Sequence, residues 1–235
     1  PFNDALIAGG EFLTAGGVTV NYIASWNGLA WSPLGTGLTG PVLALAVWDN
    51  TLVAGGLFRS ADGISVDNIA CWNGSNWAPL GAGLNGPVRA LTVYDGRLIA
   101  GGDFTAAGAQ ECNHIASWDG SRWSSMKSGM NGRVQALAVF QDELIAGGHF
   151  SEAGGTRANN IASWHGFSWV PWKSHTWSRL GSGLEGGFFK MVGAPVKTLC
   201  VYGADLIAGG ALTASGEVRL DYIGSWNGSR WSTPE

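Results

Sequence analysis

Short apolar runs recur along the whole chain, and glycine, asparagine or proline separates them. One set of four reads PVLALAV at 41–47, LVAGG at 52–56, IACW at 69–72 and WAPLG at 77–81. Valine, isoleucine and tryptophan favour strands, and runs of this length between turn residues are typical of short β-strands. The pattern therefore predicts an all-β chain with four strands in each period.

The four-strand pattern repeats with a fixed spacing. The motif [IV]AGG occurs at 7–10, 53–56, 99–102, 145–148 and 207–210, so its spacings are 46, 46, 46 and 62. The excess of 16 resolves into two insertions of eight residues, Phe167–Ser174 and Gly187–Ala194. The repeat units are approximately 1–41, 42–87, 88–133, 134–194 and 195–235, within a single domain covering 1–235.

An Asn-Gly, Asp-Gly or His-Gly pair separates the third and fourth strands of each unit, as at Asn27-Gly28. Asn-Gly and Asp-Gly predict a type I′ hairpin turn and hence antiparallel pairing. Identical antiparallel units that cannot bury their faces alone predict a β-propeller of five blades. A fifth copy of the segment 36–46 is absent, so one blade lacks its first strand. Continuation of the natural protein, a three-stranded blade, or a strand from another chain would each account for this.

The pattern IAGGxF…NxIASWNGxxWxPLG resembles known repeat families over essentially the whole chain. The Gly-Gly pair followed by spaced aromatics resembles the kelch class of propeller repeats. The fuller pattern is similar to repeats in secreted bacterial proteins and in fungal cell-surface cortical markers. This resemblance implies a propeller, and it favours a secreted or cell-surface location. It does not imply an activity, because propellers host enzymes, lectins and scaffolds.

Composition excludes several classes of partner and site. Charged residues make up 13% of the chain, the net charge is −4, and no Lys/Arg cluster occurs, which argues against nucleic-acid binding. No apolar run reaches the length of a membrane span. Because there is no CxxC motif, we expect no metal and no cofactor. We expect Cys71, Cys112 and Cys200 to be free thiols packed as small hydrophobic residues.

The residues that repeat are expected to be scaffold. Two tryptophans recur in each unit and are expected to fill the spaces between blades. The set is Trp26, Trp31, Trp72, Trp77, Trp118, Trp123, Trp164, Trp177, Trp226 and Trp231.

Candidate functional residues lie where the copies differ. Glu11, Asp103 and His149 follow the Gly-Gly pair in three units, but we expect them in separate blades as solvated or locally paired side chains. A second variable position, at the start of the first strand, holds Arg89, Gln135 and Lys197 in three of the units. If that strand is innermost, these three residues are candidates for the mouth of a central channel.

The two insertions in the fourth unit are the strongest departure from the repeat. Exposed aromatics in loops mark binding surfaces, and tryptophan faces suit sugar rings. The ligand-binding candidates are Phe167, Trp169, Trp172, His175, Phe188 and Phe189. The alternative is that these loops pack on each other, plug the ring, or cover the incomplete blade.

The interpretation favoured by these features is a non-catalytic binding or interaction propeller whose partner is a carbohydrate or a protein. One alternative is a glycosidase, which needs a pair of carboxylates about 5–10 Å apart; no such pair stands out. A Ser-His-Asp nucleophile lacks a GxSxG motif, so we expect no catalytic residues. A second alternative is a passive structural module of a longer protein. A monomer is expected in preference to a strand-exchanged oligomer.

Overall fold

A computed structural model of the chain describes residues 1–166, 175–186 and 195–234, and all of its regular elements there are β-strands. Among these residues no helix is long and apolar enough to cross a bilayer. The strands form four four-stranded antiparallel sheets, one three-stranded sheet and five short hairpins. The predicted fold class, five propeller blades of which one lacks a strand, is confirmed.

Each blade is one antiparallel sheet built in chain order. The first blade has β1 (Leu6–Gly9), β4 (Ile23–Trp26) and β5 (Trp31–Pro33). The second has β6 (Val42–Trp48), β7 (Thr51–Gly56), β10 (Ile69–Trp72) and β11 (Trp77–Pro79). The third has β12 (Val88–Tyr94), β13 (Arg97–Gly102), β16 (Ile115–Trp118) and β17 (Trp123–Ser125). The fourth has β18 (Val134–Phe140), β19 (Glu143–Gly148), β22 (Ile161–Trp164) and β23 (Trp177–Arg179). The fifth has β24 (Val196–Tyr202), β25 (Asp205–Gly210), β28 (Ile223–Trp226) and β29 (Trp231–Ser232).

A two-residue hairpin that the sequence pattern did not predict stands between the second and third strands of every blade. These hairpins are β2 (Thr14–Ala15) with β3 (Val18–Thr19), β8 (Ser60–Ala61) with β9 (Ile64–Ser65), β14 (Ala106–Ala107) with β15 (Gln110–Glu111), β20 (Glu152–Ala153) with β21 (Thr156–Arg157), and β26 (Ala214–Ser215) with β27 (Val218–Arg219). Strands of two residues are too short to show an alternating apolar pattern.

The type I′ prediction for the Asn-Gly hairpins is wrong. Trp26 faces Trp31 across a four-residue loop, and only Gly28 in that loop has positive φ. Asn27 instead accepts hydrogen bonds at its Oδ1 from the backbone N–H groups of Leu29 and Ala30, both at 2.9 Å. A side chain that binds its own loop favours a longer turn over the two-residue one.

Pairs of residues with positive φ occur instead in the hairpins that join the first and second strands. Asp49 and Asn50 have φ of 47° and 55°, and Trp48 pairs with Thr51 across them. Asp95 and Gly96 repeat this arrangement between β12 and β13. Two successive residues with positive φ are the requirement of a type I′ turn.

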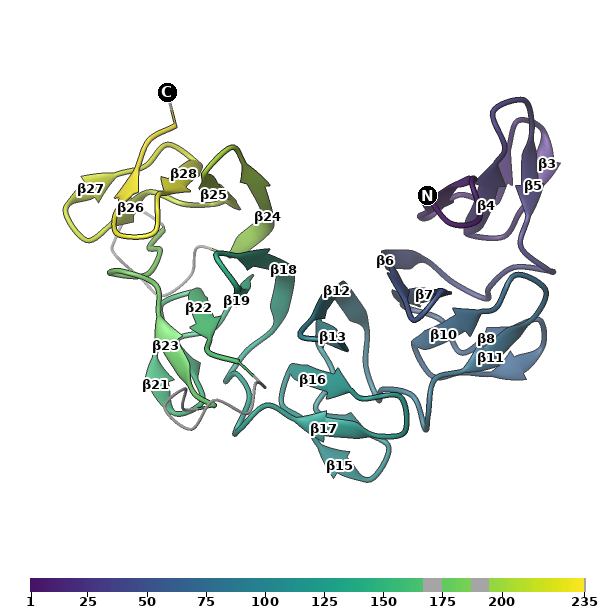
Figure 1. Cartoon of the computed structure of the whole chain (residues 1–235), viewed down its shortest axis with the longest axis horizontal. Coiled ribbons are helices and arrows are strands. Elements are labelled where there is room, and N and C mark those ends of the chain that lie inside the picture. Colours follow the sequence, from purple (N-terminus) through teal and green to yellow (C-terminus); the bar gives the residue numbers. More distant parts are fainter. Residues whose placement is uncertain (167–174, 187–194, 235) are drawn as a thin grey trace.

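Successive blades pack face to face in an arc, with the first strands β6, β12, β18 and β24 along its inner side (Figure 1). The N-terminal and C-terminal blades lie at the two ends of the arc (Figure 1). Every hydrophobic cluster combines residues of two neighbouring blades; one joins Ile99, Ile115 and Met126 to Val134 and Leu144. The core therefore lies between the blades, as expected for units that cannot bury their faces alone.

Close approach between blades depends on the first glycine of the Gly-Gly pair. A Cβ placed on Gly101 would lie 2.6 Å from Cγ1 of Val134 in the next blade, and one on Gly55 would lie 2.5 Å from Cγ1 of Val88. Since real atoms do not approach so closely, the glycine is what admits the valine. The repeated motif thus encodes a contact between blades.

The periodic tryptophans also connect the blades. In each unit the two rings pack against each other with centroids 5.1–5.4 Å apart. The indole N–H of Trp123 donates to the carbonyl of Leu80 in the preceding blade at 3.1 Å, and Trp177 does the same to Met126 at 3.1 Å. Buried tryptophans whose N–H has a partner stabilise the packing without an unpaired donor.

Exposure of the three cysteines differs from blade to blade. Cys112 is buried and Cys71 is half-buried, as expected for small packed residues, but Cys200 is exposed. Cys200 lies on β24 of the last blade in the arc. The equivalent Ala46 in the second blade packs against the following blade. In this structure no further blade covers that face of the fifth one (Figure 1).

Candidate binding site

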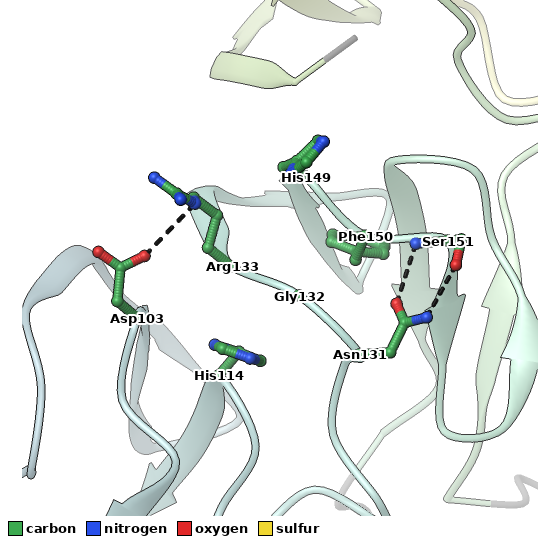
Figure 2. Close-up of a pocket in the computed structure, with 8 residues that line it drawn as sticks. All are labelled: Asp103, His114, Asn131, Gly132, Arg133, His149, Phe150 and Ser151. Atoms are coloured by element: carbon green, nitrogen blue, oxygen red, sulfur yellow. Dashed lines mark hydrogen bonds and ion pairs between the residues drawn. The ribbon is translucent and has the colours of Figure 1, made fainter. Parts of the chain in front are cut away.

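A hollow of about 460 Å³ lies between the rims of the third and fourth blades. Eight residues line it: Asp103, His114, Asn131, Gly132, Arg133, His149, Phe150 and Ser151. Asp103 and His114 come from the third blade, and the others come from the connection into the fourth blade and the end of its second strand (Figure 2). A neighbouring hollow of about 360 Å³ shares His114 and Asn131 with it.

Backbone hydrogen bonds place the four ionisable side chains of the hollow. The N–H of His149 donates to the carbonyl of Arg133 at 2.9 Å, which holds these two residues side by side on the fourth blade. On the third blade the N–H of Gly102, the residue before Asp103, donates to the carbonyl of His114 at 3.0 Å. The side chains of Asp103 and His114 on the third blade therefore lie opposite those of Arg133 and His149 on the fourth blade.

Asp103 is the electrostatic centre of this group. Its Oδ2 accepts hydrogen bonds from Nε and Nη2 of Arg89, at 2.8 and 2.6 Å. Nε of Arg133 lies 3.6 Å from the other carboxylate oxygen, as Figure 2 shows. Two guanidinium groups thus face one carboxylate, which leaves the rim with an excess of positive charge.

Arg133 is the more accessible of the two cations. Its side chain is 49% exposed, against 32% for Arg89. Within the part of the chain that the structure describes, its terminal nitrogens make no hydrogen bond. These nitrogens form the fork that recognises carboxylate or phosphate groups.

His114 and Phe150 form the less polar side of the hollow. Burial lowers the pKa of His114, whereas the Gly102 carbonyl near Nδ1, at 3.2 Å, and the Asp103 carboxylate oppose the shift; Arg133 lowers it further. The ring is therefore neutral at pH 7. Phe150 is almost completely buried, and His149 is exposed.

Asn131 fixes the loop that carries Arg133. Its Oδ1 accepts hydrogen bonds from the backbone N–H groups of Ser151 and Glu152, both at 2.9 Å. Asn85 makes the same two contacts one blade earlier, with Thr105 and Ala106. Because the clamp repeats, we assign Asn131 to the scaffold and the ionisable residues to the site.

The structure brings together two of the three residues that follow the Gly-Gly pairs in the sequence. Asp103 and His149 line one hollow, and Glu11 lies in the first blade at the end of the arc. Among the described residues, no three His, Cys, Asp or Glu side chains are grouped so as to hold a metal ion.

Arg89, Gln135 and Lys197 lie at equivalent places on the inner strands β12, β18 and β24. Each stands where the pairing with the second strand shifts register, so each is the extra residue of a β-bulge. Bulges redirect side chains, and that of Arg89 meets Asp103. The Oε1 of Gln135 is buried without a hydrogen-bond partner among the described residues, and Lys197 is exposed.

Most of the aromatic candidates in the insertions fall outside the described residues. These are Phe167, Trp169, Trp172, Phe188 and Phe189. His175 is described and is exposed.

Sequence reasoning did not single out Arg133 and His114. Arg133 occupies the place of Pro41, Pro87 and Pro195, and His114 that of Asn68 and Asn160. The 46-residue alignment contains this signal. The alignment does not show that these two positions lie close together across the space between blades.

Comparison with known proteins places the chain in a family. The family model described as the Rax2 C-terminal beta propeller domain matches residues 73–234, which is more than half of the chain. The chain belongs to this Rax2 propeller family. A search of curated proteins finds no match.

The solved structure of a designed protein supports the fold of this Rax2-family domain. The computationally designed Ika8 protein has a TM-score of 0.53 and 16% identity, over 95% of the present chain. This chain spans 55% of the length of that protein. The designed Ika4 protein has a TM-score of 0.45 and 18% identity, over 74% of this chain and 88% of its own. Family and fold together indicate a binding or structural propeller module.

Proposed function

We propose that this domain is a binding propeller and that the hollow between the third and fourth blades is a non-catalytic site that holds an acidic group of its ligand. The main support is that Asp103, His114, Arg133 and His149 line one hollow. His114 and Arg133 replace residues that other units share, and Asp103 and His149 stand at a position that differs in every unit. The other blade junctions use proline, asparagine, leucine or alanine at most of these positions. Random surface variation would be scattered over the blades.

The chemistry of the hollow favours an anion. Arg133 offers a guanidinium fork, and exposed His149 offers a further donor on the same blade. The neutral ring of His114 and the face of Phe150 provide apolar contact next to them. A sugar that carries a carboxylate or a sulfate combines these two requirements. Carbohydrate is accordingly the ligand class we propose. The aromatic residues of the fourth-unit insertions stay a separate candidate surface, because the described residues next to the first insertion lie beside the start of β19, whereas His149 and the hollow lie at its end. The kelch-like interpretation of the Gly-Gly pairs stays a prediction.

An array of neutral and acidic oligosaccharides tests the proposal. The decisive variant combines His114→Asn, Arg133→Pro and His149→Leu, each of which installs the residue of another blade and should therefore keep the fold. We expect it to lose acidic glycans while wild type retains them. Thr39→Asn is the matched control, since it installs at the first junction the residue that Asn85 and Asn131 provide at the next two.

Three results would overturn parts of the proposal. If wild type retains no saccharide, the ligand class is wrong. If the triple variant binds acidic glycans as wild type does, the hollow is not the site. If the Trp169→Ala/Trp172→Ala variant binds as wild type does, the insertions do not contribute.

A further inference from the structure

Four side chains on the fourth blade form a continuous hydrogen-bonded chain, distinct from the hollow. Oε1 of Glu143 lies 2.9 Å from Nδ1 of His165, and Nε2 of His165 lies 2.6 Å from Oγ of Ser178. The Oγ atoms of Ser178 and Ser163 are 2.9 Å apart. Glu143 begins β19, His165 follows β22, and Ser178 is the middle residue of β23, so three adjacent strands bring the groups together.

The chemistry of the groups fixes the direction of the hydrogen bonds when the imidazole is neutral. A carboxylate can only accept, so the proton of His165 lies on Nδ1 and points at Glu143. Nε2 then carries a lone pair, and it accepts the hydroxyl proton of Ser178. Ser163 is left to donate to Ser178 Oγ, which holds that atom in place. Acid, base and hydroxyl thus follow the order required for activation of a serine.

The other blades show what this arrangement replaces. Asn27, Asn73, Asp119 and Asn227 occupy the position of His165 and bind their own loops. In Asp119, hydrogen bonds from the N–H groups of Ser121 and Arg122 lower the pKa of the carboxyl to about 2. The side chain of His165 instead contacts Glu143 on β19 and Ser178 on β23.

Accessibility and anchoring also fit a reactive group. The side chains of His165 and Glu143 are 34% and 32% exposed, and Ser178 is half-buried. The N–H of Gly166 donates to Oη of Tyr94 in the third blade at 3.1 Å, which fixes the chain directly after His165. The backbone next to His165 is therefore anchored to the third blade.

We propose that Ser178 is a nucleophilic serine that takes the acyl group of an activated ester, with His165 as its base and Glu143 as the positioning residue. Oγ of Ser178 forms a bond to the acyl carbon, and the hydroxyl proton passes to Nε2 of His165. The bond from the acyl carbon to the leaving oxygen breaks, and the leaving group takes up that proton. Water then attacks the acyl-serine, which releases the acid and restores the hydroxyl. This activity goes beyond the proposed binding function and does not depend on it.

A fluorophosphonate probe tests the nucleophile directly, since attack forms an Oγ–P bond and expels fluoride. The full chain is incubated with the probe, and the adduct is located by peptide mass mapping. We expect one adduct, on Ser178, and none on Ser178→Ala, which carries the residue of Ala78 in the second blade. With p-nitrophenyl acetate we expect a burst of one p-nitrophenolate per chain, absent from Ser178→Ala.

Two variants separate activation from mere exposure. His165→Asn restores the turn residue of the other blades, so it should fold, and we expect labelling to slow at least about tenfold. Glu143→Gln should also slow labelling, and Glu143→Asp, the residue of Asp205 in the fifth blade, should recover part of the rate. Ser124→Ala is the matched control. Ser124 occupies the same place on β17 beside Ser117, where Asp119 replaces the histidine, and its removal should change nothing.

The labelling rates decide the proposal. No adduct on the wild-type chain, an adduct at Ser124 as fast as at Ser178, or an unchanged rate in His165→Asn overturns it. An unchanged rate in Glu143→Gln removes the positioning role of Glu143.

Discussion

The junction between the second and third blades and the junction between the third and fourth share one scaffold and differ in chemistry. In both, a glycine admits a valine of the next blade, and a tryptophan N–H donates to a carbonyl of the preceding blade. At the rim, the junction between the second and third blades has Leu57, Asn68, Pro87 and Asp103. The junction between the third and fourth blades has Asp103, His114, Arg133 and His149. The rim can therefore change its side chains while the packing beneath it stays constant.

This division has a physical cause. Packing residues contact the next unit, so a change in one copy must suit two blades. Rim residues contact solvent on one side, where substitution costs little. A repeat of this kind can acquire a polar site at one junction without disturbing the others.

Truncation of one tryptophan at each junction should cause the largest loss of stability among these variants. It also tests whether the two junctions contribute equally to stability. Trp123→Ala and Trp177→Ala each remove a buried ring, at 7% and 4% exposure, together with its hydrogen bond to the preceding blade. We expect a loss of about 3–5 kcal/mol in the free energy of unfolding for each. Urea unfolding followed by far-UV circular dichroism measures both. A difference well above 1 kcal/mol between them would show that the two junctions are not equivalent.

The glycine–valine contacts should give the next largest effect. Gly55→Ala and Gly101→Ala each place a methyl group within 2.6 Å of the facing valine, so we expect each to cost about 1–3 kcal/mol. Val134→Ala combined with Gly101→Ala removes the shortest contact, at 2.6 Å, and leaves the Cβ of residue 134 at 3.0 Å. The double variant should therefore be less destabilised than the sum of the single variants, by a coupling of about 0.5 kcal/mol or more. Additive losses in the same urea assay would mean that the contact does not decide the spacing of the blades.

The repetition made the fold predictable. Spacing of the Gly-Gly pairs and tryptophans predicted the number of blades and the position of the tryptophans between them, and the Asn-Gly and Asp-Gly pairs predicted the antiparallel order. The hairpin chemistry was predictable only in part, because Asn27 uses its side chain to bind its loop. The site was the least predictable. Arg89 was expected as a channel residue and Asp103 as a solvated or locally paired one, and only the bulge on β12 shows that the two residues pair with each other.

The remaining site residues lie far apart in the sequence and meet only in the folded protein, which explains why their grouping could not be predicted from sequence. His165 and Ser178 are separated by the first insertion, and Glu143 is a further strand away. No local motif links the three. Register across β19, β22 and β23 brings them together, and register depends on the pairing of Trp164 with Trp177. Arg133 and Asp103 likewise lie close together only because the third and fourth blades pack against each other.

Titration of His114 should give the smallest effect, and it tests the polar junction alone. Burial places the pKa of His114 below the ordinary value of about 6.5, so the unfolded chain binds the proton more readily. The stabilisation that depends on a neutral His114 ring is fully present above about pH 6.5. It is lost as the pH falls through the lower pKa of the folded protein. His114→Asn should therefore lose less stability than wild type between pH 7 and pH 5. Chemical-shift titration should show the midpoint of His114 rising in Arg133→Pro, which removes a cation, and falling in Asp103→Asn. A midpoint at or above 6.5 in wild type would contradict the effect of burial, and the same midpoint in all three proteins would show that the charges of the hollow do not act on this ring.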